Sequence, residues 1–540
     1  MKSCEYGKLA GGKRGDRIIA LLLCIAVLFA AASGLDYNCW WPDDYAAYIN
    51  DGIAIAGEYY EEQTRLNYFM HPSDMPDEAK DGTLVYVWGY PLVLSLVYSA
   101  VGFDRTDYHS IIFYKLPSVI SLAAATGILY LLFRRRMSRA SSVLLSVYVC
   151  IHPKILEGAY NMYSDVFFMM LSTAAVFTAE RFICSLDEAK PGARSYISGA
   201  ALGLLMLACY ETRLNGITVC ALVLLMHAAH ILQQRKAAVN REGQKPRVKI
   251  STIAVLPYAV FVVTAVLCRL FVLPKATANT SDLIGVTLSQ MLGNVKIYGR
   301  LMYEYFAEIH TGTLPHAVRL AISAAAALLI CVGIIKGWKK DEFFCTYMIF
   351  TALTFLTLIC LPYTQGHRYL FNILPFILMA LGYGLDSAYA WLRERFKGGA
   401  ALDKAASAAA ILLTAVILVS SASGNLFRVL RGEDVRAEGV GQAYSRGSLE
   451  MYDYVKNEIP EDAIIAFLKP RVMYLNTGRV SFCPTVNNDI HTLTDADYYI
   501  VCGGLYTYDR DEQQLIKDNN AILEEQYSCG DYYVVYKVIS

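Results

Sequence analysis

The sequence has few charged residues. Of its 540 residues, 18% are Asp, Glu, Lys or Arg, whereas 55% are hydrophobic. A soluble chain of this length carries more charge, so we expect an integral membrane protein. The basic and acidic side chains number 48 each, which gives a formal net charge of zero. A net charge of zero gives no reason to expect a polyanion, and we expect no nucleic acid as a partner.

Paired cysteine motifs are also missing. The 14 cysteines form no CxxC pair, which argues against a zinc or thioredoxin-type site, and most of them lie inside apolar runs as small hydrophobic residues. The chain has no repeat of fixed period and no low-complexity tract. It also lacks the corresponding inverted halves that are typical of a transporter.

The hydrophobic residues gather in long runs. Residues 1–17 are basic and precede an apolar run at 18–34, which favours a retained first helix with a cytoplasmic N-terminus. A cleaved signal peptide is the alternative, because the sequence AAASG resembles a cleavage site. Further runs approach the ~20 residues that a bilayer requires. They lie at about 113–133, 141–159, 162–182, 196–211, 214–232, 251–273, 317–335, 343–361, 370–390 and 405–423.

The apolar segment 83–102 decides the topology. If it crossed the membrane, the basic cluster Arg134–Arg136 would lie outside, against the positive-inside rule. We therefore expect a non-spanning helix, broken at Gly89-Tyr90-Pro91. The result is a polytopic α-helical membrane protein with about eleven transmembrane helices in the cell membrane, its N-terminus inside and its C-terminus outside.

Three parts follow from this topology: a cytoplasmic N-terminus (1–17), a transmembrane domain (18–423) with a large outer loop at 35–112, and a small extracytoplasmic α/β domain (424–540). Within the last part, the patterns predict a helix at 450–460 and strands around 463–468, 497–504 and 531–539, with a helix and a strand at 511–527. Cys502 and Cys529 lie near these strands, and a disulfide between them is left open.

Two adjacent carboxylates, Asp43 and Asp44, follow Trp40-Trp41-Pro42 just after the first apolar run. Trp favours the membrane–water interface, which places this pair at the bilayer surface. A helix N-cap explains one Asp after a proline but not two. A helix N-terminus also keeps a carboxylate ionised, and a general base requires the ionised form. We therefore interpret the pair as part of a reaction centre.

Basic residues are rare on the predicted outer side, and three of them stand in short loops: Lys154, Arg213 and Arg368. They either snorkel to lipid headgroups or converge on a phosphate, whose oxygens match the fork of a guanidinium. Asp165 opens an apolar run on the same side and is either a cap or a second catalytic acid. Two other acids, Glu157 and Glu211, are expected to pair with the cations beside them.

One further acidic pair, Glu304 and Glu308, lies four residues apart on a probable outer helix. This spacing usually marks the solvated face of a helix, and we expect no more of it here.

The order of these features resembles the GT-C class of membrane glycosyltransferases. The similarity is nearest to the dolichyl-phosphate-mannose–protein mannosyltransferases and the bacterial aminoarabinose transferases. The segments that carry it span nearly the whole chain. They include PDDYAAYINDG, WGYPLVLSLVYSAVGFD, YSDVFFMMLSTAAVF, ACYETRLNGI, HRYLFNILPFILMALGYGL and the tail from VKNEIPEDAIIAFL to DYYVVYKV.

The resemblance implies that Asp43 is the base, Asp44 its acidic neighbour, Asp165 the second acidic position and Arg368 the basic residue before a late helix. The family usually has Asp-Glu where this chain has Asp-Asp, so a shift of one residue would exchange the first two roles. Metal dependence varies in the class, so from this resemblance we predict no metal and no other cofactor for this chain.

The implied activity is an inverting transfer of a sugar from a polyprenyl-phosphate donor to an acceptor hydroxyl, such as that of a glycan, lipid or protein. The reaction would take place at the outer face among membrane lipids. A phosphate leaves as a stable anion, so one carboxylate base and a cationic clamp of Lys154, Arg213 and Arg368 form a sufficient set. The main alternative is a transporter or flippase of lipid-linked sugars, with no transferase chemistry.

Overall fold

The structure is a computed structural model. It describes residues 14–39, 44–57, 87–187, 192–242, 252–271, 286–307, 315–361, 364, 366–395, 399–433, 442–484, 493–502, 509–529 and 533–539.

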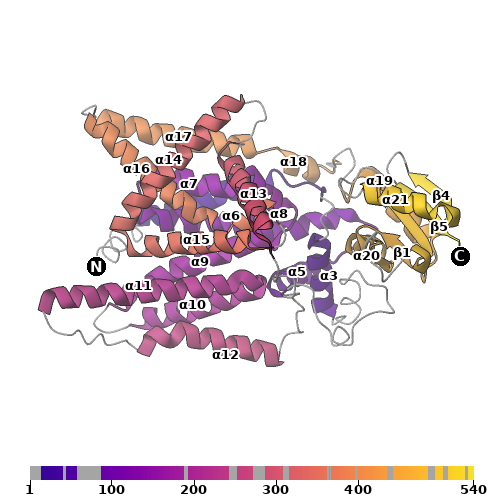
Figure 1. Cartoon of the computed structure of the whole chain (residues 1–540), viewed down its shortest axis with the longest axis horizontal. Helices are drawn as coiled ribbons and strands as arrows, with labels where there is room; N and C mark the ends of the chain where they lie inside the picture. Colours follow the sequence, from indigo (N-terminus) through magenta and orange to yellow (C-terminus); the bar gives the residue numbers. More distant parts are fainter. Residues whose placement is uncertain are drawn as a thin grey trace.

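A bundle of long helices forms the larger part of the molecule (Figure 1). Nine helices in the described ranges are long and apolar enough to cross a membrane. They are α2 (Arg14–Ala32), α6 (Ile111–Arg134), α9 (Ser164–Ser185), α10 (Ala193–Thr212), α11 (Ile217–Glu242), α12 (Leu256–Phe271), α14 (His316–Lys340), α15 (Glu342–Ile359) and α17 (Ala400–Ser421). The multi-pass helical membrane fold predicted from the sequence is confirmed.

Two further segments account for the difference from the predicted eleven crossings. Helices α7 (Arg139–Ile151) and α8 (Pro153–Tyr160) form a span bent by 45°, which would be a tenth. The bend lies at His152, whose ring accepts the backbone N–H of Lys154 ahead of the Pro-led helix. Helix α16 (Leu374–Arg395) is 22 residues long and corresponds to the apolar run at 370–390, but it is not among the nine.

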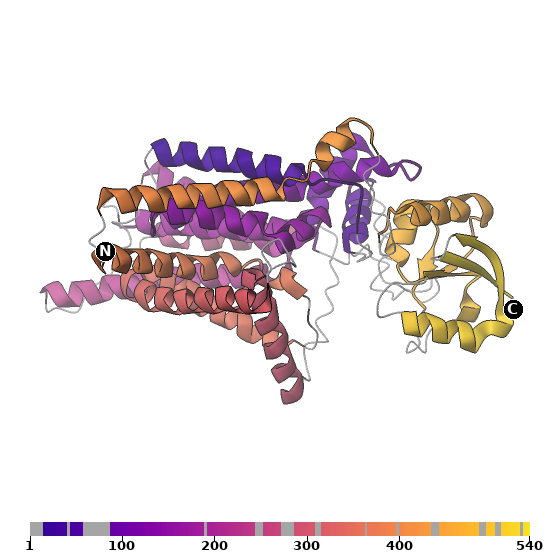
Figure 2. The ribbon, with the colours of Figure 1, turned by 90° about the horizontal axis from the view of Figure 1, so that it is seen from above.

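The described part of the segment 83–102, residues 87–102, contains a short helix, α5 (Gly89–Val101). Its 13 residues extend about 20 Å, which is too short for a bilayer. It packs on α3 (Asp44–Gly57), where Gly52 touches the backbone of α5. Both helices lie at one end of the bundle, between the bundle and the C-terminal part (Figures 1 and 2).

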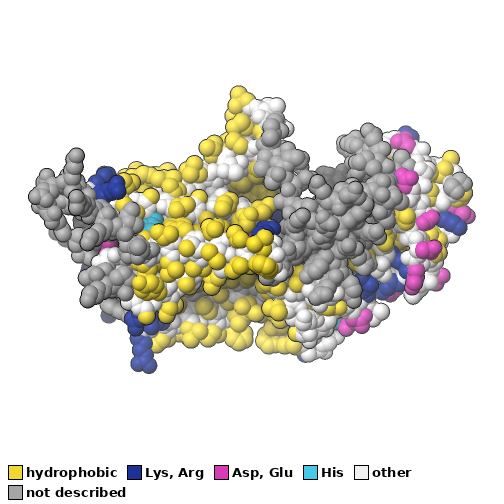
Figure 3. Space-filling view, turned by 90° about the horizontal axis from the view of Figure 1, so that it is seen from below, with side chains coloured by type: hydrophobic (Ala, Val, Ile, Leu, Met, Phe, Trp, Pro, Cys, Tyr) yellow, Lys and Arg dark blue, Asp and Glu magenta, His cyan; other side chains and the backbone are white. Residues whose placement is uncertain are grey.

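Apolar side chains cover most of the bundle face shown in Figure 3. Helix α14 shows the pattern most clearly, since only Ala326, Gly333 and Gly337 of its 25 residues are buried. An apolar surface of this extent fits contact with lipid rather than water. The remaining described helices are α13 (Leu288–Ala307) and α18 (Asn425–Leu430), with 3-10 turns η3 (Tyr108–Ser110), η4 (Leu214–Gly216), η5 (Thr252–Val255) and η7 (Gly366–Leu370).

A five-stranded sheet forms the C-terminal part. Four of its strands lie in the segments predicted from the sequence, and the two-residue strand Ser481–Phe482 was not predicted. Its strand order is β2-β1-β3-β5-β4, with β3–β5 and β5–β4 antiparallel and the other pairs parallel. The elements are α19 (Arg446–Glu458), β1 (Ile465–Phe467), α20 (Pro470–Thr477), β2 (Ser481–Phe482), η8 (Leu493–Asp495), β3 (Tyr498–Cys502), α21 (Asp509–Asn519), η10 (Asn520–Ile522), β4 (Leu523–Cys529) and β5 (Tyr533–Val538). Helix α20 packs on α3 at the end of the bundle.

Cys502 and Cys529 form no disulfide with each other. Both are in register with Tyr533 on β5, which lies between their strands. Two strand spacings separate their backbones by about 9.5 Å, beyond the ~7 Å limit for a disulfide.

Candidate active site

Four charged residues from distant parts of the chain meet at the end of the bundle nearest α3. Asp44 is the first residue of α3, and Asp165 lies in the first turn of α9. Arg213 is the C-cap residue of α10, and Arg368 lies in the turn η7 before α16. Each sits at a helix end rather than mid-span, so all four reach the same level of the bundle.

The first ion pair joins Arg368 to Asp44. Nη1 of Arg368 donates to Oδ2 of Asp44, and each side chain is about four-fifths buried. The guanidinium also lies over two aromatic rings, 5.3 Å from the centre of Tyr163 and 5.7 Å from that of Tyr369. Such stacking uses the planar shape of arginine, which lysine does not offer.

The second ion pair joins Arg213 to Asp165. Nη1 of Arg213 donates to Oδ2 of Asp165 at 2.7 Å and to the Ser164 hydroxyl at 3.1 Å. That hydroxyl is 2.8 Å from the Tyr48 hydroxyl on α3. The ring of Tyr369 lies 5.4 Å from the Arg213 guanidinium and also contacts Arg368, so one aromatic ring connects the two pairs.

The electrostatics of the cluster keep its cations charged. Burial acts to lower the pKa of Arg368, but Asp44 and Asp165 outweigh it, and the net pKa is raised. Burial and Asp44 together raise the pKa of the Tyr48 hydroxyl, which therefore stays protonated. The site is a desolvated group of two guanidinium ions and two carboxylates, stabilised by aromatic faces and hydroxyl groups.

A strained backbone residue precedes this group. Met162, between α8 and α9, is buried and has φ of 55°, a left-handed value that non-glycine residues rarely adopt. Tyr163 and Ser164, the next two residues, contact Arg368 and Arg213 respectively. The tight turn thus places two site residues in the cluster. Backbone strain of this kind is often found at functional sites.

The other predicted site residues have different surroundings. Asp43 lies outside the described residues. Lys154 is one third exposed and lies 3.7 Å from Glu157, so it does not join either arginine pair. Glu211 pairs with Arg269 of α12 at 3.2 Å and not with Arg213 beside it, which corrects the expected neighbour pairing.

Glu304 and His367 form a contact that the sequence interpretation missed. Glu304 was predicted to lie on a solvated face, but it is buried, 2.7 Å from Arg300 and 3.0 Å from Nε2 of His367. Burial and the charge of Lys154 lower the pKa of His367, against the effect of Glu304. The sequence feature that could have indicated His367 as a residue near the site is its position directly before Arg368. Glu308 lies outside the described residues.

Comparison with solved structures identifies the fold. The chain is similar to ArnT from Cupriavidus metallidurans bound to undecaprenyl phosphate, with a TM-score of 0.54 and 10% identity, covering 96% of this chain and 97% of that one. It is also similar to the Archaeoglobus fulgidus oligosaccharyltransferase in complex with Zn and sulfate, with a TM-score of 0.51 and 12% identity, covering 97% and 73% of the two chains. The chain has the fold of the GT-C membrane glycosyltransferases, as the resemblance in sequence implied.

Sequence comparison gives the family. The chain belongs to DUF6541, a family of unknown function, whose model matches residues 58–468. A search of curated proteins finds no match. Within the described ranges, no three His, Cys, Asp or Glu side chains gather as a metal site would require.

Proposed function

We propose that this protein is a membrane glycosyltransferase that moves a sugar from a polyprenyl-phosphate donor to an acceptor hydroxyl, with inversion at the anomeric carbon. One observation carries the proposal: Asp44, Asp165, Arg213 and Arg368 meet in a single cluster at one end of a GT-C-type bundle. The ArnT structure with the same fold contains undecaprenyl phosphate, a ligand of the proposed donor class.

The two guanidinium ions are the proposed phosphate clamp. A guanidinium carries five N–H donors in a planar fork that matches phosphate oxygens, and Nη1 of each arginine makes the carboxylate contact described above. The negative charge that develops on the leaving phosphate is stabilised by donors already in position, which is the most effective electrostatic form of catalysis. Lys154, which lies apart from both pairs, is proposed to contact the donor from the rim of the site.

The reaction needs one base. The acceptor oxygen attacks the anomeric carbon while the bond from that carbon to the phosphate oxygen breaks, and the polyprenyl phosphate leaves with the electron pair. The acceptor proton passes to a carboxylate, for which we propose Asp43. Asp44 is engaged by Arg368, so we assign it and Asp165 to holding the clamp in place. This division of roles favours the assignment made from the sequence over the exchanged one.

The orientation follows from the distribution of basic residues. Arg134, Arg135, Arg136, Lys336 and Lys340 lie at the helix ends opposite Asp44. By the positive-inside rule we propose that this opposite end faces the cytoplasm. The site, α3 and the C-terminal sheet then lie on the outer side of the cell membrane.

Purified protein incubated with radiolabelled polyprenyl-phosphate sugars tests the proposal. We expect sugar release or transfer with one donor, and a loss of about 10²–10⁴-fold for Asp43→Asn because a general base contributes that much. Asp453→Asn, an exposed change on α19, is the matched control and should retain activity. Full activity of the Asp43 variant would remove that residue from the mechanism. Movement of lipid-linked sugars across vesicles without turnover would favour the flippase alternative.

A further inference from the structure

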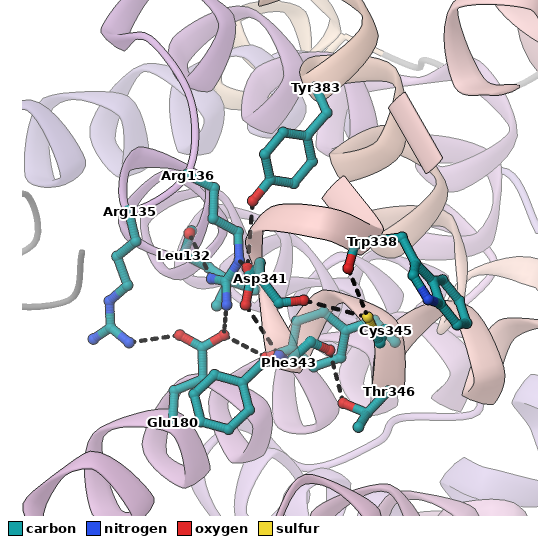
Figure 4. A network of polar contacts seen from close by, with 11 residues as sticks. Leu132, Arg135, Arg136, Glu180, Trp338, Asp341, Phe343, Cys345, Thr346 and Tyr383 are labelled. Carbon is teal, nitrogen blue, oxygen red and sulfur yellow. Dashed lines mark hydrogen bonds and ion pairs between the residues drawn. The ribbon is translucent and has the colours of Figure 1, made fainter. Parts of the chain in front are cut away.

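A second charged region lies at the end of the bundle opposite Asp44, where α6 and α14 end. Figure 4 shows its polar contacts from close by. Arg135 and Arg136, at the end of α6, both donate to Glu180 of α9, Arg135 at 2.7 Å. Arg136 also donates to Asp341, which accepts from the backbone N–H of Phe343 at 3.0 Å as the N-cap of α15. These groups are at least nine-tenths buried, and their charges neutralise one another.

A cavity of about 840 Å³ opens beside this network, between α14 and α16. Helix α14 contributes Lys336 and Lys340 to its lining, and α16 contributes Asp386 and Glu394. The network residues Arg135, Arg136, Glu180 and Asp341 line it as well. The lining therefore contains four cations and four carboxylates.

The charges outside the network are available to a ligand. In the described part of the chain, no hydrogen bond or ion pair engages the side chains of Lys336, Lys340 or Glu394. Asp386 accepts only neutral donors, the Ser138 backbone N–H at 2.8 Å and the Ser141 hydroxyl at 2.7 Å. Two positive and two negative groups thus face the cavity uncompensated.

The walls of the cavity are apolar and reach the lipid-facing surface. Leu328 and Trp391 both line it and are 66% and 62% exposed, and Val332 lies between the lysines and Leu328 along α14. An exposed apolar wall below a rim of lysines is the arrangement that receives an acyl chain and a phosphate headgroup. A small soluble ligand would make no use of the apolar wall.

We propose that this cavity binds a phospholipid of the leaflet opposite the Asp44 cluster, with a headgroup that contains both a phosphate and a primary ammonium group. The phosphate lies between Lys336 and Lys340, and the ammonium group donates to Asp386 and Glu394. A zwitterionic headgroup satisfies both signs and leaves the site neutral, whereas a purely anionic one leaves two carboxylates uncompensated near the membrane. A choline headgroup has no N–H to donate and fits less well.

Native mass spectrometry of the delipidated full-length protein tests the proposal, with phosphatidylethanolamine, phosphatidylglycerol or phosphatidylcholine added in turn. We expect phosphatidylethanolamine to be retained about tenfold more tightly than the other two. Changing Lys336 and Lys340 together to Gln should weaken its retention about 30-fold, as two lost lysine contacts to lipid predict. Lys339→Gln is the matched control, since Lys339 is exposed in the same helical turn but does not line the cavity.

Glu394→Gln is a second variant at an exposed position, and it should reduce the preference for ethanolamine over glycerol headgroups. Equal retention of all three lipids, or equal loss with Lys339→Gln, would overturn the proposal. Soluble phosphoethanolamine serves as the probe for the alternative source. If it displaces the lipid at equal concentration, the acyl chain contributes nothing and the site is not a lipid site.

Discussion

The pairing of Arg368 with Asp44 predicts a measurable coupling. Both side chains are about four-fifths buried, 21% and 18% exposed, so the pair lies nearer to a buried ion pair than to a surface one. Removing one partner of a buried pair costs ~3–5 kcal/mol because a charge is left without compensation. Allowing for the exposed fifth, we expect Arg368→Gln to lower the free energy of unfolding by about 2–4 kcal/mol.

A double-mutant cycle isolates this term. Asp44→Asn alone leaves the guanidinium without its counter-charge, whereas the double variant contains neither charge. The double variant should therefore lose about 1–3 kcal/mol less stability than the sum of the two single variants. The assay is denaturant unfolding in detergent micelles. Arg446→Gln, which removes an exposed pair with Glu450 on α19, is the control and should change stability by less than about 1 kcal/mol. Strict additivity of the two single changes would refute the pairing.

The same unfolding assay can test binding of the proposed donor. A polyprenyl phosphate at 100 times its Kd should stabilise the wild-type protein by ~2.7 kcal/mol, because it binds only the folded state. The Arg368→Gln variant should lose most of this gain at the same lipid concentration. An equal gain in both proteins would show that the phosphate binds elsewhere.

Three further predictions concern individual residues. His367 has a lowered pKa, so its protonation destabilises the folded state, and the free energy of unfolding of the wild type should decrease as pH falls below about 6.5. Unfolding titrations at pH 5.5 and 7.5 should show a smaller decrease for His367→Gln. Gly333→Ala should cost about 1–3 kcal/mol in thermal unfolding because its Cβ would meet the Ala380 carbonyl, whereas Gly293→Ala, with open space, should not destabilise. Lys115→Met should cost about 3–5 kcal/mol in denaturant titration by leaving Asp36 uncompensated.

Local patterns predicted four of the five strands of the C-terminal sheet and most of the spanning helices, because period and apolar length are properties of short stretches. They missed β2, whose two residues are too few to show a period. The sequence also indicated that Asp165, Arg213 and Arg368 stand at helix mouths on one side. It did not predict which acid each cation contacts, since that depends on helix packing. Arg213 pairs with Asp165 on the neighbouring helix, and Glu211, two residues away in the sequence, pairs with Arg269 instead.

Glu304 shows a limit of prediction from periodicity. A spacing of four residues between acids on an amphipathic helix predicts a solvated face, and nothing within α13 contradicts it. What buries Glu304 is the turn at 366–370, more than sixty residues away. The basic cluster at residues 134–136 was likewise interpreted only as a topology signal. Its partner Glu180 is a single acid near the end of an apolar run, and no local sequence feature predicted this ion pair.

Helix α9 explains why both ends of the bundle contain paired charges. Asp165 and Glu180 are 15 residues apart on this helix, a separation of about 22 Å. The hydrocarbon core of a bilayer is ~30 Å thick, so the two carboxylates cannot both reach bulk water along the helix axis. Both are also more than nine-tenths buried in the bundle. Each must therefore hold a cation, as Arg213 and Arg136 show. At the Asp44 end, the donor phosphate of the proposed reaction would supply the same negative charge to the arginines. If the proposed function holds, the ion pairs seen there are the state of the site before the donor binds. The energetic cost of binding should then be small, because the cations are already dehydrated and in position.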